Sequence, residues 1–105
     1  MSFLGLCRRA KKLVIGADIT VESAKNGNSE LILYARDFSK NSLKHVLEAA
    51  ENYGVEALEI DRSKEELSFA LGKLCGVLSV EDKGFADKLR GMVNTKQGGE
   101  FYDKI

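Results

Sequence analysis

The chain has 105 residues, of which 44% are hydrophobic and 30% charged, with 16 basic and 16 acidic side chains. This length suits one domain with a substantial core, and the composition excludes a disordered chain. No apolar stretch reaches the length of a membrane span, and Phe3, Leu4 and Leu6 precede Arg8 and Arg9, the reverse of a secretion signal. Two cysteines without paired spacing favour a reducing compartment. We therefore expect a cytoplasmic protein with no membrane segment.

Charge is distributed unevenly along the chain. Residues 1–27 carry five basic and two acidic side chains, a net charge of +3, whereas residues 28–66 carry five basic and nine acidic ones, a net charge of −4. A total charge of zero argues against a strongly basic nucleic-acid binder. The N-terminal quarter is where an anionic partner is expected, although basic clusters are more often simply solvated faces.

The first predicted element is a helix close to the N-terminus. Its apolar residues recur at helical spacing, which predicts one buried stripe, and a buried cysteine in that stripe would act as a small hydrophobe. Basic residues cover its outer face and its end, where cations suit the helix dipole. The predicted stripe is Phe3, Leu6, Cys7 and Ala10, and the basic residues are Arg8, Arg9, Lys11 and Lys12.

A short apolar strand at residues 13–15 leads through Gly16 directly into a second helix. Glycine at such a turn lets the backbone approach another molecule closely. The start of the helix offers unpaired N–H groups and a partial positive charge, both of which favour phosphate. An ordinary strand-to-helix turn explains the same residues. The helix has a predicted buried face of Ala17, Val21 and Ala24, and it ends at Asn26 and a left-handed Gly27.

Three further strands and three further helices are predicted. A nearly continuous apolar run indicates a strand covered on both sides, and two glutamates in the following strand indicate an exposed end or edge. A serine followed three residues later by glutamate is typical of a capping box. In order, we expect a strand Leu31–Ala35, a helix capped by Ser39 or Ser42 that buries Leu43, Val46, Leu47 and Ala50, a strand Val55–Ile60 with Glu56 and Glu59, a helix begun by Ser63 and Glu66 that buries Leu67, Ala70, Leu71 and Leu74, a strand Val77–Val80, and a helix capped by Asp82 that buries Phe85, Leu89, Met92 and Val93.

Helices and strands therefore alternate throughout, with short loops between them. This order predicts a single α/β domain over residues 1–93, a three-layer α/β/α sandwich around a four-stranded mixed sheet, followed by a polar tail at 94–105. Three connections are expected to meet at one edge of the sandwich, unless they are ordinary loops: the helix start Gly16–Glu22, the loop Arg36–Lys40 and the loop Lys73–Gly76.

Signs of catalysis are few. His45 lies off the predicted stripe of its helix, and no serine or cysteine nucleophile stands at a readable spacing from it. Cys75 lies in a loop, a position that allows it to be exposed, and one cysteine with one histidine does not make a zinc site. The sequence has neither a P-loop nor a dinucleotide-binding glycine motif. We predict no enzyme activity, no cofactor and no metal.

Short motifs spread over most of the chain carry a resemblance to a known family. They are Leu4-Gly5-Leu6 with Arg8-Arg9-Ala10, Lys12-Leu13-Val14-Ile15-Gly16, Lys25-Asn26-Gly27, Leu31-Ile32-Leu33-Tyr34-Ala35-Arg36-Asp37 and Leu71-Gly72-Lys73. With them the sequence resembles the ribosomal protein L7Ae family, and within it the bacterial YlxQ-type members, from about Leu4 to Leu89. The resemblance implies a small non-enzymatic sandwich, and many members bind kink-turn RNA, including ribosomal RNA.

The resemblance also implies where RNA would be contacted. In the family, the helix after the glycine carries an Asn-Glu or similar polar pair and then a lysine, which contact the sheared G·A pairs and nearby phosphates. Here Asp18, Ile19 and Glu22 stand at those positions. Acidic side chains repel phosphate, so this exchange weakens or alters the site. The family's second contact region corresponds to Leu74 and Cys75 before Gly76, where apolar side chains suit packing under extruded bases.

The resulting hypothesis is a ribosome-associated protein that binds structured RNA of the kink-turn type through an altered site. The alternative is a protein-interaction module in which an exposed Ile19 and the acidic helix face bind a partner protein. A small hydrolase is disfavoured because no nucleophile–base pair is present. The expected contact edge comprises Gly16, Asp18, Ile19, Glu22, Arg36, Lys40, Leu74 and Cys75, with phosphate contacts from Lys11, Lys12 and Lys25.

Overall fold

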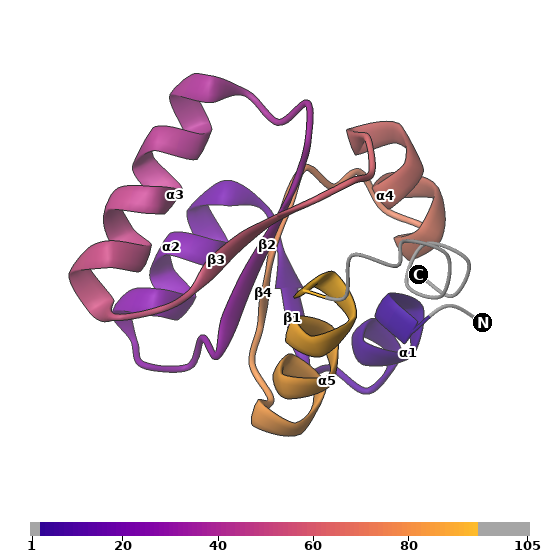
Figure 1. The fold of residues 1–105 in the computed structure, drawn as a ribbon, viewed down its shortest axis with the longest axis horizontal. Coiled ribbons are helices and arrows are strands. Elements are labelled where there is room, and N and C mark those ends of the chain that lie inside the picture. The colour runs from indigo at the N-terminus through magenta and orange to yellow at the C-terminus, as the bar shows by residue number, and fades with distance from the viewer. Residues whose placement is uncertain (1–2, 95–105) are drawn as a thin grey trace.

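The computed structural model describes residues 3–94 of the chain, and the predicted tail beyond residue 94 lies outside them. Helices and strands alternate in the predicted order, which confirms the α/β fold (Figure 1). Within the described range, no helix is both long enough and apolar enough to cross a membrane. The elements are α1 (Phe3–Arg9), β1 (Leu13–Ile15), α2 (Ala17–Lys25), β2 (Leu31–Ala35), α3 (Lys40–Tyr53), β3 (Ala57–Ile60), α4 (Lys64–Leu71), β4 (Val77–Val80) and α5 (Lys83–Asn94).

The sheet is mixed and has the strand order β1-β4-β2-β3. Strand β4 is antiparallel to β1 and β2, whereas β2 and β3 are parallel. Strands β1, β2 and β3 therefore all end at the edge where β4 begins, which we call the Gly16 edge. We call the other the Lys12 edge, because β1 begins there just after Lys12. Strand β3 lies at the side of the sheet, as its glutamates indicated.

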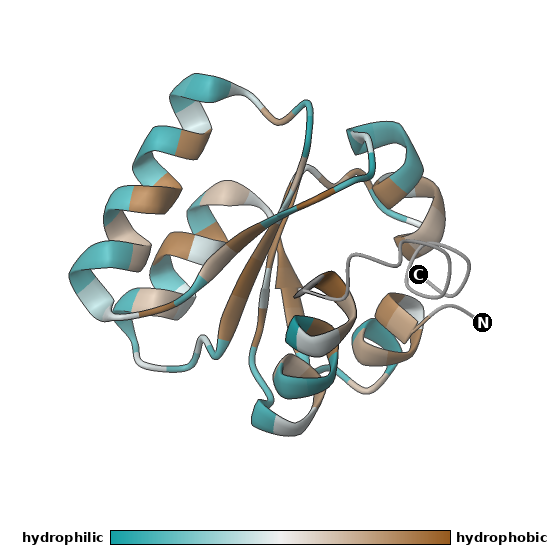
Figure 2. Ribbon diagram, viewed as in Figure 1, coloured by the Kyte–Doolittle hydropathy of each residue, from teal (hydrophilic) through white to brown (hydrophobic). Residues whose placement is uncertain are grey.

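Helices α2 and α3 cover one face of the sheet, and α1, α4 and α5 cover the other (Figure 1). Alternate residues of β2 serve the two faces: Ile32 packs with the core beneath α2 and α3, and Leu31 and Leu33 pack in the larger core opposite. All three are fully buried, which confirms a strand covered on both sides. Figure 2 shows the same division, with apolar residues along the strands and hydrophilic ones on the outward helix faces.

The buried stripe of α1 differs from the prediction. Leu4 and Cys7 are fully buried, whereas Leu6 is 45% exposed and Ala10 lies beyond the end of the helix. A helix of seven residues with apolar side chains on both sides of the stripe does not fix its own rotation. Tertiary packing fixes it instead, because the Phe3 ring packs edge-on against Phe85 with centroids 5.5 Å apart.

The other helices follow the prediction at their ends more closely than along their stripes. The capping box is present, with the Ser63 N–H donating to the Glu66 carboxylate and the Glu66 N–H donating to the Ser63 hydroxyl. Asp82 caps α5 by accepting a hydrogen bond from the Phe85 N–H. In α3, Ala49 is buried where Leu47 was expected to be. Leu74 was expected to be buried by α4, but the helix ends at Leu71 and Leu74 is exposed.

Candidate functional site

The start of α2 forms the first part of the site. Gly16 has φ 119° and ψ 153°, a conformation that residues with a side chain rarely adopt. Its N–H donates to the Val77 carbonyl at 3.0 Å, which fixes the turn beside the first residue of β4. Because Gly16 has no side chain to cap the first turn, the N–H groups there remain available to an outside acceptor. The geometry suits an anion or a base edge.

The exposed face of α2 carries three side chains of the expected contact edge. Asp18, Ile19 and Glu22 are all exposed, and Ile19 has 48% of its surface accessible. This confirms that Ile19 lies off the buried face of its helix. Asp18 in the first turn stabilises the helix through its dipole, but both carboxylates oppose the approach of phosphate.

The loop before β4 contributes one exposed side chain and one buried one. Leu74 is 85% exposed, whereas Cys75 is only 2% exposed, so Cys75 is buried although its loop position would allow exposure. The Cys75 N–H donates to the Ser68 hydroxyl at 2.9 Å, which draws this residue against α4. Burial raises the pKa of the Cys75 thiol to about 11. Any side-chain contact from this pair of residues therefore falls to Leu74.

Gly76 brings the loop after β2 against the loop before β4. The Ala35 N–H donates to the Gly76 carbonyl at 2.9 Å. A Cβ atom at Gly76 would lie 2.6 Å from Cδ1 of Phe38, so only glycine leaves room for this ring. Together with the Gly16 hydrogen bond to Val77, these contacts confirm that the three predicted segments converge on one edge.

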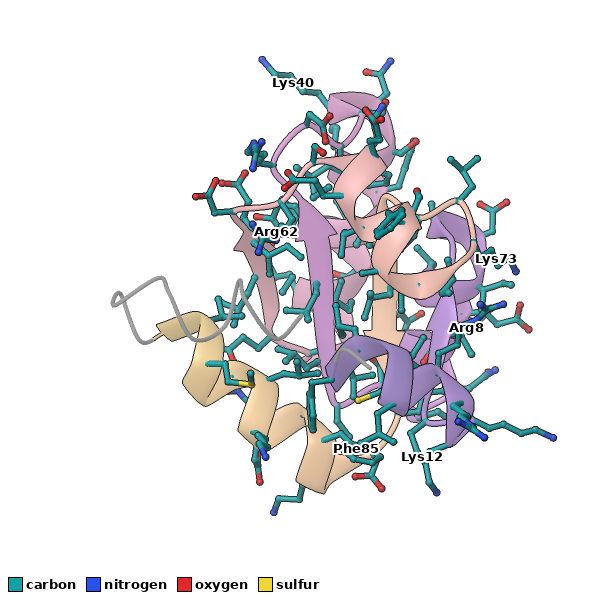
Figure 3. The ribbon with its side chains drawn as sticks, turned by 90° about the vertical axis from the view of Figure 1, so that its right-hand side faces the viewer. Arg8, Lys12, Lys40, Arg62, Lys73 and Phe85 are labelled. Carbon is teal, nitrogen blue, oxygen red and sulfur yellow. The ribbon has the colours of Figure 1, made fainter. Side chains whose placement is uncertain are left out.

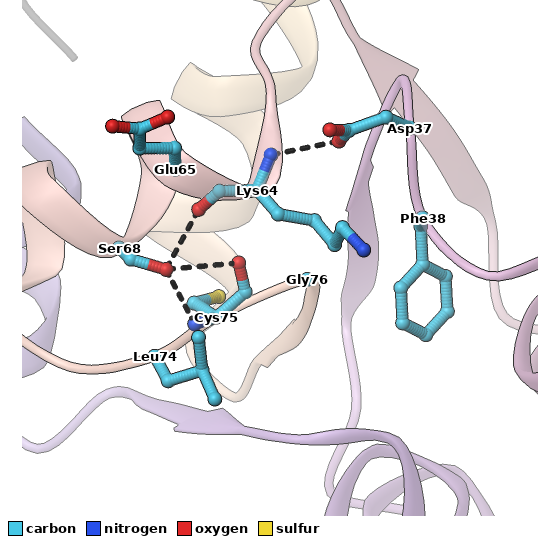
Figure 4. A pocket seen from close by; sticks show the side chains of 8 residues that line it. All are labelled: Asp37, Phe38, Lys64, Glu65, Ser68, Leu74, Cys75 and Gly76. Atoms are coloured by element: carbon cyan, nitrogen blue, oxygen red, sulfur yellow. Dashed lines mark hydrogen bonds between the residues drawn. The ribbon is translucent and has the colours of Figure 1, made fainter.

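A pocket of about 580 Å³ lies between these two loops and the start of α4 (Figure 4). Its wall is fixed by hydrogen bonds, since the Lys64 N–H donates to Asp37 at 2.7 Å and Ser68 donates to the Lys64 carbonyl at 2.7 Å. The position of α4 at this edge was not predicted from the sequence. Because β3 is parallel to β2, it ends at the Gly16 edge, and α4 therefore begins there. The lining residues are Asp37, Phe38, Lys64, Glu65, Ser68, Leu74, Cys75 and Gly76.

Phe69 was also missed by the sequence reasoning. This aromatic side chain lies on the outer face of α4 and is 92% exposed. It falls between Ser68, which holds the loop before β4, and Ala70, which is half-buried. Leu67 and Leu71 of α4 are buried, and Phe69 lies on the opposite side of the helix from them. Only this position around the helix distinguishes Phe69 from an aromatic residue of the core.

The cations expected at the contact edge differ in their surroundings. The Arg36 guanidinium lies 3.2 Å from Asp61 and 3.3 Å from Glu66, so carboxylates already balance its charge. The hydrogen bond from the Ser63 N–H, with further help from Arg36, lowers the pKa of Glu66. Lys40, at the start of α3, is exposed and has no salt bridge within residues 3–94.

Lys11, Lys12 and Lys25 lie elsewhere. The Lys12 carbonyl accepts from the Glu81 N–H at 2.7 Å where β4 ends, and Lys25 lies at the far end of α2. Lys12 is four extended residues from Gly16, about 13 Å along β1. Figure 3 shows Lys12 and Lys40 at opposite ends of the molecule. The structure therefore does not bring these three lysines to the contact edge.

The fold and this edge define a class of small α/β/α domains that present a helix start beside an apolar loop. Residues 1–90 match the model of the Ribosomal protein L7Ae/L30e/S12e/Gadd45 family, and the chain belongs to this family. It is similar to RNA-binding protein YlxQ of Enterococcus faecium, with 31% identity over 89% of each chain. To RNA-binding protein YlxQ of Bacillus subtilis it is 34% identical, over 87% of this chain and 91% of the relative.

Solved structures show the same fold. A protein of unknown function from Bacillus halodurans superposes with a TM-score of 0.82 at 28% identity, over 88% of this chain and 93% of that one. A 15.5 kD RNA binding protein from Giardia lamblia gives a TM-score of 0.69 at 23% identity, over 87% of this chain and 81% of that one. The family match and the similarity to the two YlxQ proteins confirm the predicted family and its bacterial YlxQ-type members.

Proposed function

We propose that this protein is a non-enzymatic RNA-binding protein that recognises a kinked RNA of the kink-turn type at the Gly16 edge. The observation that carries the proposal is the convergence of the α2 start and the Leu74 loop, which the Gly16–Val77 hydrogen bond holds together. Membership of the L7Ae family and the RNA-binding names of the bacterial relatives support it.

The two halves of the edge suit two parts of a kinked RNA. The N–H groups at the start of α2 can donate to base edges or phosphates. The exposed Leu74 side chain provides an apolar surface beneath a base that the kink has unstacked. The adjoining pocket, with Phe38 in its wall, offers room for such a base.

The charges at this edge point to an altered site. Asp18 and Glu22 face outward, and Arg36 is already paired with carboxylates. Few phosphate contacts remain, so binding there depends mainly on shape and apolar contact, and less on counterion release than is usual for RNA binders. Lys40 is the cation of the expected edge that is both exposed and outside the salt bridges of residues 3–94.

An electrophoretic shift assay tests the proposal by comparing a kink-turn RNA with an unkinked duplex of equal length. The wild type is expected to prefer the kinked RNA. Leu74→Ala is expected to weaken binding of the kinked RNA about tenfold, because the shorter side chain buries less apolar surface when the RNA binds. Leu47→Ala, on the exposed side of α3, is the matched control. Equal binding of both RNAs by the wild type would contradict the proposal.

Glu22→Lys tests whether the acidic side chain weakens the site. Adding a phosphate contact is expected to tighten binding of the kinked RNA and to steepen its salt dependence by about one unit of slope. If the wild type fails to bind and Glu22→Lys binds, RNA recognition at this edge has been lost in this chain. Because the family includes ribosomal proteins, we also propose that the natural RNA is ribosomal and that the protein associates with ribosomes in the cytoplasm, which cosedimentation with ribosomes tests.

A protein-interaction module is the second candidate, and one observation favours it. Ile19 is 48% exposed between two carboxylates, which suits a partner that combines an apolar contact with basic side chains. Ile19→Lys should then abolish capture of the partner in a pull-down, whereas Leu47→Lys on α3 should retain it. Equal capture by both variants would exclude this face.

A further inference from the structure

The segment from α1 to the start of β1 presents cations that form no salt bridge with the other residues that the structure describes. Arg9, Lys11 and Lys12 are exposed, and within residues 3–94 none of them takes part in a salt bridge. Arg8 donates from its guanidinium to the Leu71 carbonyl, which ties α1 to the end of α4. A carbonyl carries no net charge, and Arg8 likewise forms no salt bridge among the residues that the structure describes.

Arginines elsewhere in the described chain are neutralised. Arg62 lies 3.6 Å from Glu66, and Arg90 of α5 bonds both Glu56 and Asp87. Arg36 is paired in the same way at the Gly16 edge. The contrast shows that acidic partners are available on this protein, whereas the basic side chains of α1 form no salt bridge within the residues described.

The unbalanced cations continue from α1 towards the Leu74 loop. A Cβ atom on Gly72 would lie 3.5 Å from Nη1 of Arg8, so Lys73 follows directly on a residue that approaches this arginine. Figure 3 shows Lys73, Arg8 and Lys12 following one another down the same side of the molecule. On the other flank, the Lys88 ammonium lies 5.1 Å from the centroid of the Phe3 ring. We call this set the α1 basic strip: Arg8, Arg9, Lys11, Lys12, Lys73 and Lys88.

Lys11 has a backbone conformation that is unfavourable for a residue with a side chain. Its φ is 59°, in the left-handed region that glycine normally occupies at the end of a helix. The Lys11 N–H donates to the Arg8 carbonyl and the Lys12 N–H to the Cys7 carbonyl, both at 2.9 Å, so this is an ordinary helix end. A residue other than glycine costs about 1 kcal/mol there. The chain therefore carries a positive charge at a position where glycine would be more stable.

We infer that the α1 basic strip is a second RNA-binding surface, which contacts the phosphate backbone of a double-helical segment. Of the apolar side chains of α1, Leu4 and Cys7 are buried, Phe3 is partly buried and Leu6 is 45% exposed, so basic side chains predominate on the exposed surface of the strip. This composition suits contact with phosphates independent of sequence, and it does not suit insertion into a lipid bilayer. Lys73 connects the strip to the loop of Leu74, so one RNA can reach both surfaces.

The inference rests on the proposed function only for the identity of the RNA. A kinked RNA has helices on both sides of its kink, and a helix that leaves the Gly16 edge past Lys73 would run along α1. Duplex binding itself does not require recognition of a kink. The two surfaces can therefore be tested separately, and one can fail without the other.

The test uses a plain RNA duplex of about 16 base pairs, a length that other duplex-binding domains span. Fluorescence anisotropy is measured at several salt concentrations for the full chain. The wild type is expected to bind at low salt, and Arg9→Gln/Lys12→Gln is expected to lower the slope of log affinity against log salt by about two, one unit for each phosphate contact. Circular dichroism checks that the variants are folded.

Matched variants make the result specific. Lys12→Gln alone should lower the slope by about one, whereas Lys44→Gln on the exposed face of α3 removes the same charge and should leave the slope unchanged. Leu74→Ala should not change duplex binding. The inference is overturned if the wild type does not bind the duplex at low salt, if Lys44→Gln and Lys12→Gln have equal effects, or if the double variant keeps the wild-type slope.

Discussion

The Gly16 edge and the α1 basic strip differ in almost every property that matters for recognition. At the Gly16 edge the backbone is shaped by a glycine with φ 119°, the exposed Leu74 is apolar, and Arg36 is paired with carboxylates. Along the strip, Arg9 and Lys12 are exposed and lie outside the salt bridges of residues 3–94. Shape and charge are presented by different elements of one small domain.

This difference has a physical consequence for a single RNA ligand. Apolar contact and backbone hydrogen bonds discriminate one RNA shape from another, but they add little long-range attraction. Unpaired cations attract any polyanion, and this attraction weakens as salt is added. We therefore expect the strip to supply affinity and the Gly16 edge to supply selectivity.

Gly76→Ala should damage the Gly16 edge most. The new Cβ would lie 2.6 Å from Phe38, so the ring must move and the two loops must separate. We expect a loss of about 1–3 kcal/mol in the free energy of unfolding, measured by urea denaturation. Gly91→Ala in α5, where a Cβ meets nothing within 4 Å, should instead stabilise the protein by about 0.5–1 kcal/mol. Equal stabilities of the two variants would contradict the packing assigned to Phe38.

Arg36 and Lys40 provide a comparison of paired and unpaired cations at the same edge. Arg36→Gln should change the affinity for a kink-turn RNA less than twofold, because Asp61 and Glu66 already balance this charge. Lys40→Gln should lower the affinity by a few fold and the salt slope by about one. Titrations at two salt concentrations measure both effects. A larger loss for Arg36→Gln would show that RNA displaces its carboxylate partners.

The two thiols should be nearly inert towards alkylation. Burial raises the pKa of both Cys7 and Cys75 from 9.0 to about 11, and the thiolate is the reactive form. Alkylation followed by mass spectrometry should be slow at pH 8 and should accelerate as the pH approaches 11. The raised pKa values also make the free energy of unfolding depend on pH. The protonated thiols contribute to stability below pH 9, and this contribution is lost as the pH rises towards 11.

A positive control for this reactivity is available in the same loop. Leu74→Cys places a thiol at a position that is 85% exposed in the native protein, next to the buried Cys75. The introduced thiol should react with the alkylating reagent far faster than the native ones. Rapid modification of Cys75 at pH 8 in the folded wild type would show that the loop opens, and that Cys75 is available at the edge.

Much of the fold was readable from the sequence because local signals agree with tertiary structure. The apolar run of Leu31–Ala35 predicted the central strand, and Ser63 with Glu66 predicted a helix start that the structure contains. The rotation of α1 was not readable, because Phe3, Leu4, Leu6 and Cys7 allow more than one stripe and the contact with Phe85 decides between them.

The sequence predicted which backbone segments meet at the candidate site, but it did not predict which of the charged side chains there are paired. Convergence of the loops at Gly16 follows from the alternation of strands and helices. The pairing of Arg36 with Asp61 joins residues 25 apart, and no local pattern encodes it. A strand of three residues separates Lys12 from Gly16, which places this lysine at the opposite edge of the sheet, and charge alone does not reveal this separation.

The salt dependence of selectivity tests the division between the two surfaces most directly. The affinities of the wild type for a kink-turn RNA and for a plain duplex of equal length are measured at 50 and 200 mM salt. Because uncharged contacts at the Gly16 edge provide most of the preference and Lys40 adds about one phosphate contact, both affinities should fall while their ratio falls by no more than about fourfold. A ratio that collapses towards one as salt is added would contradict the account, because the preference would then arise from phosphate contacts.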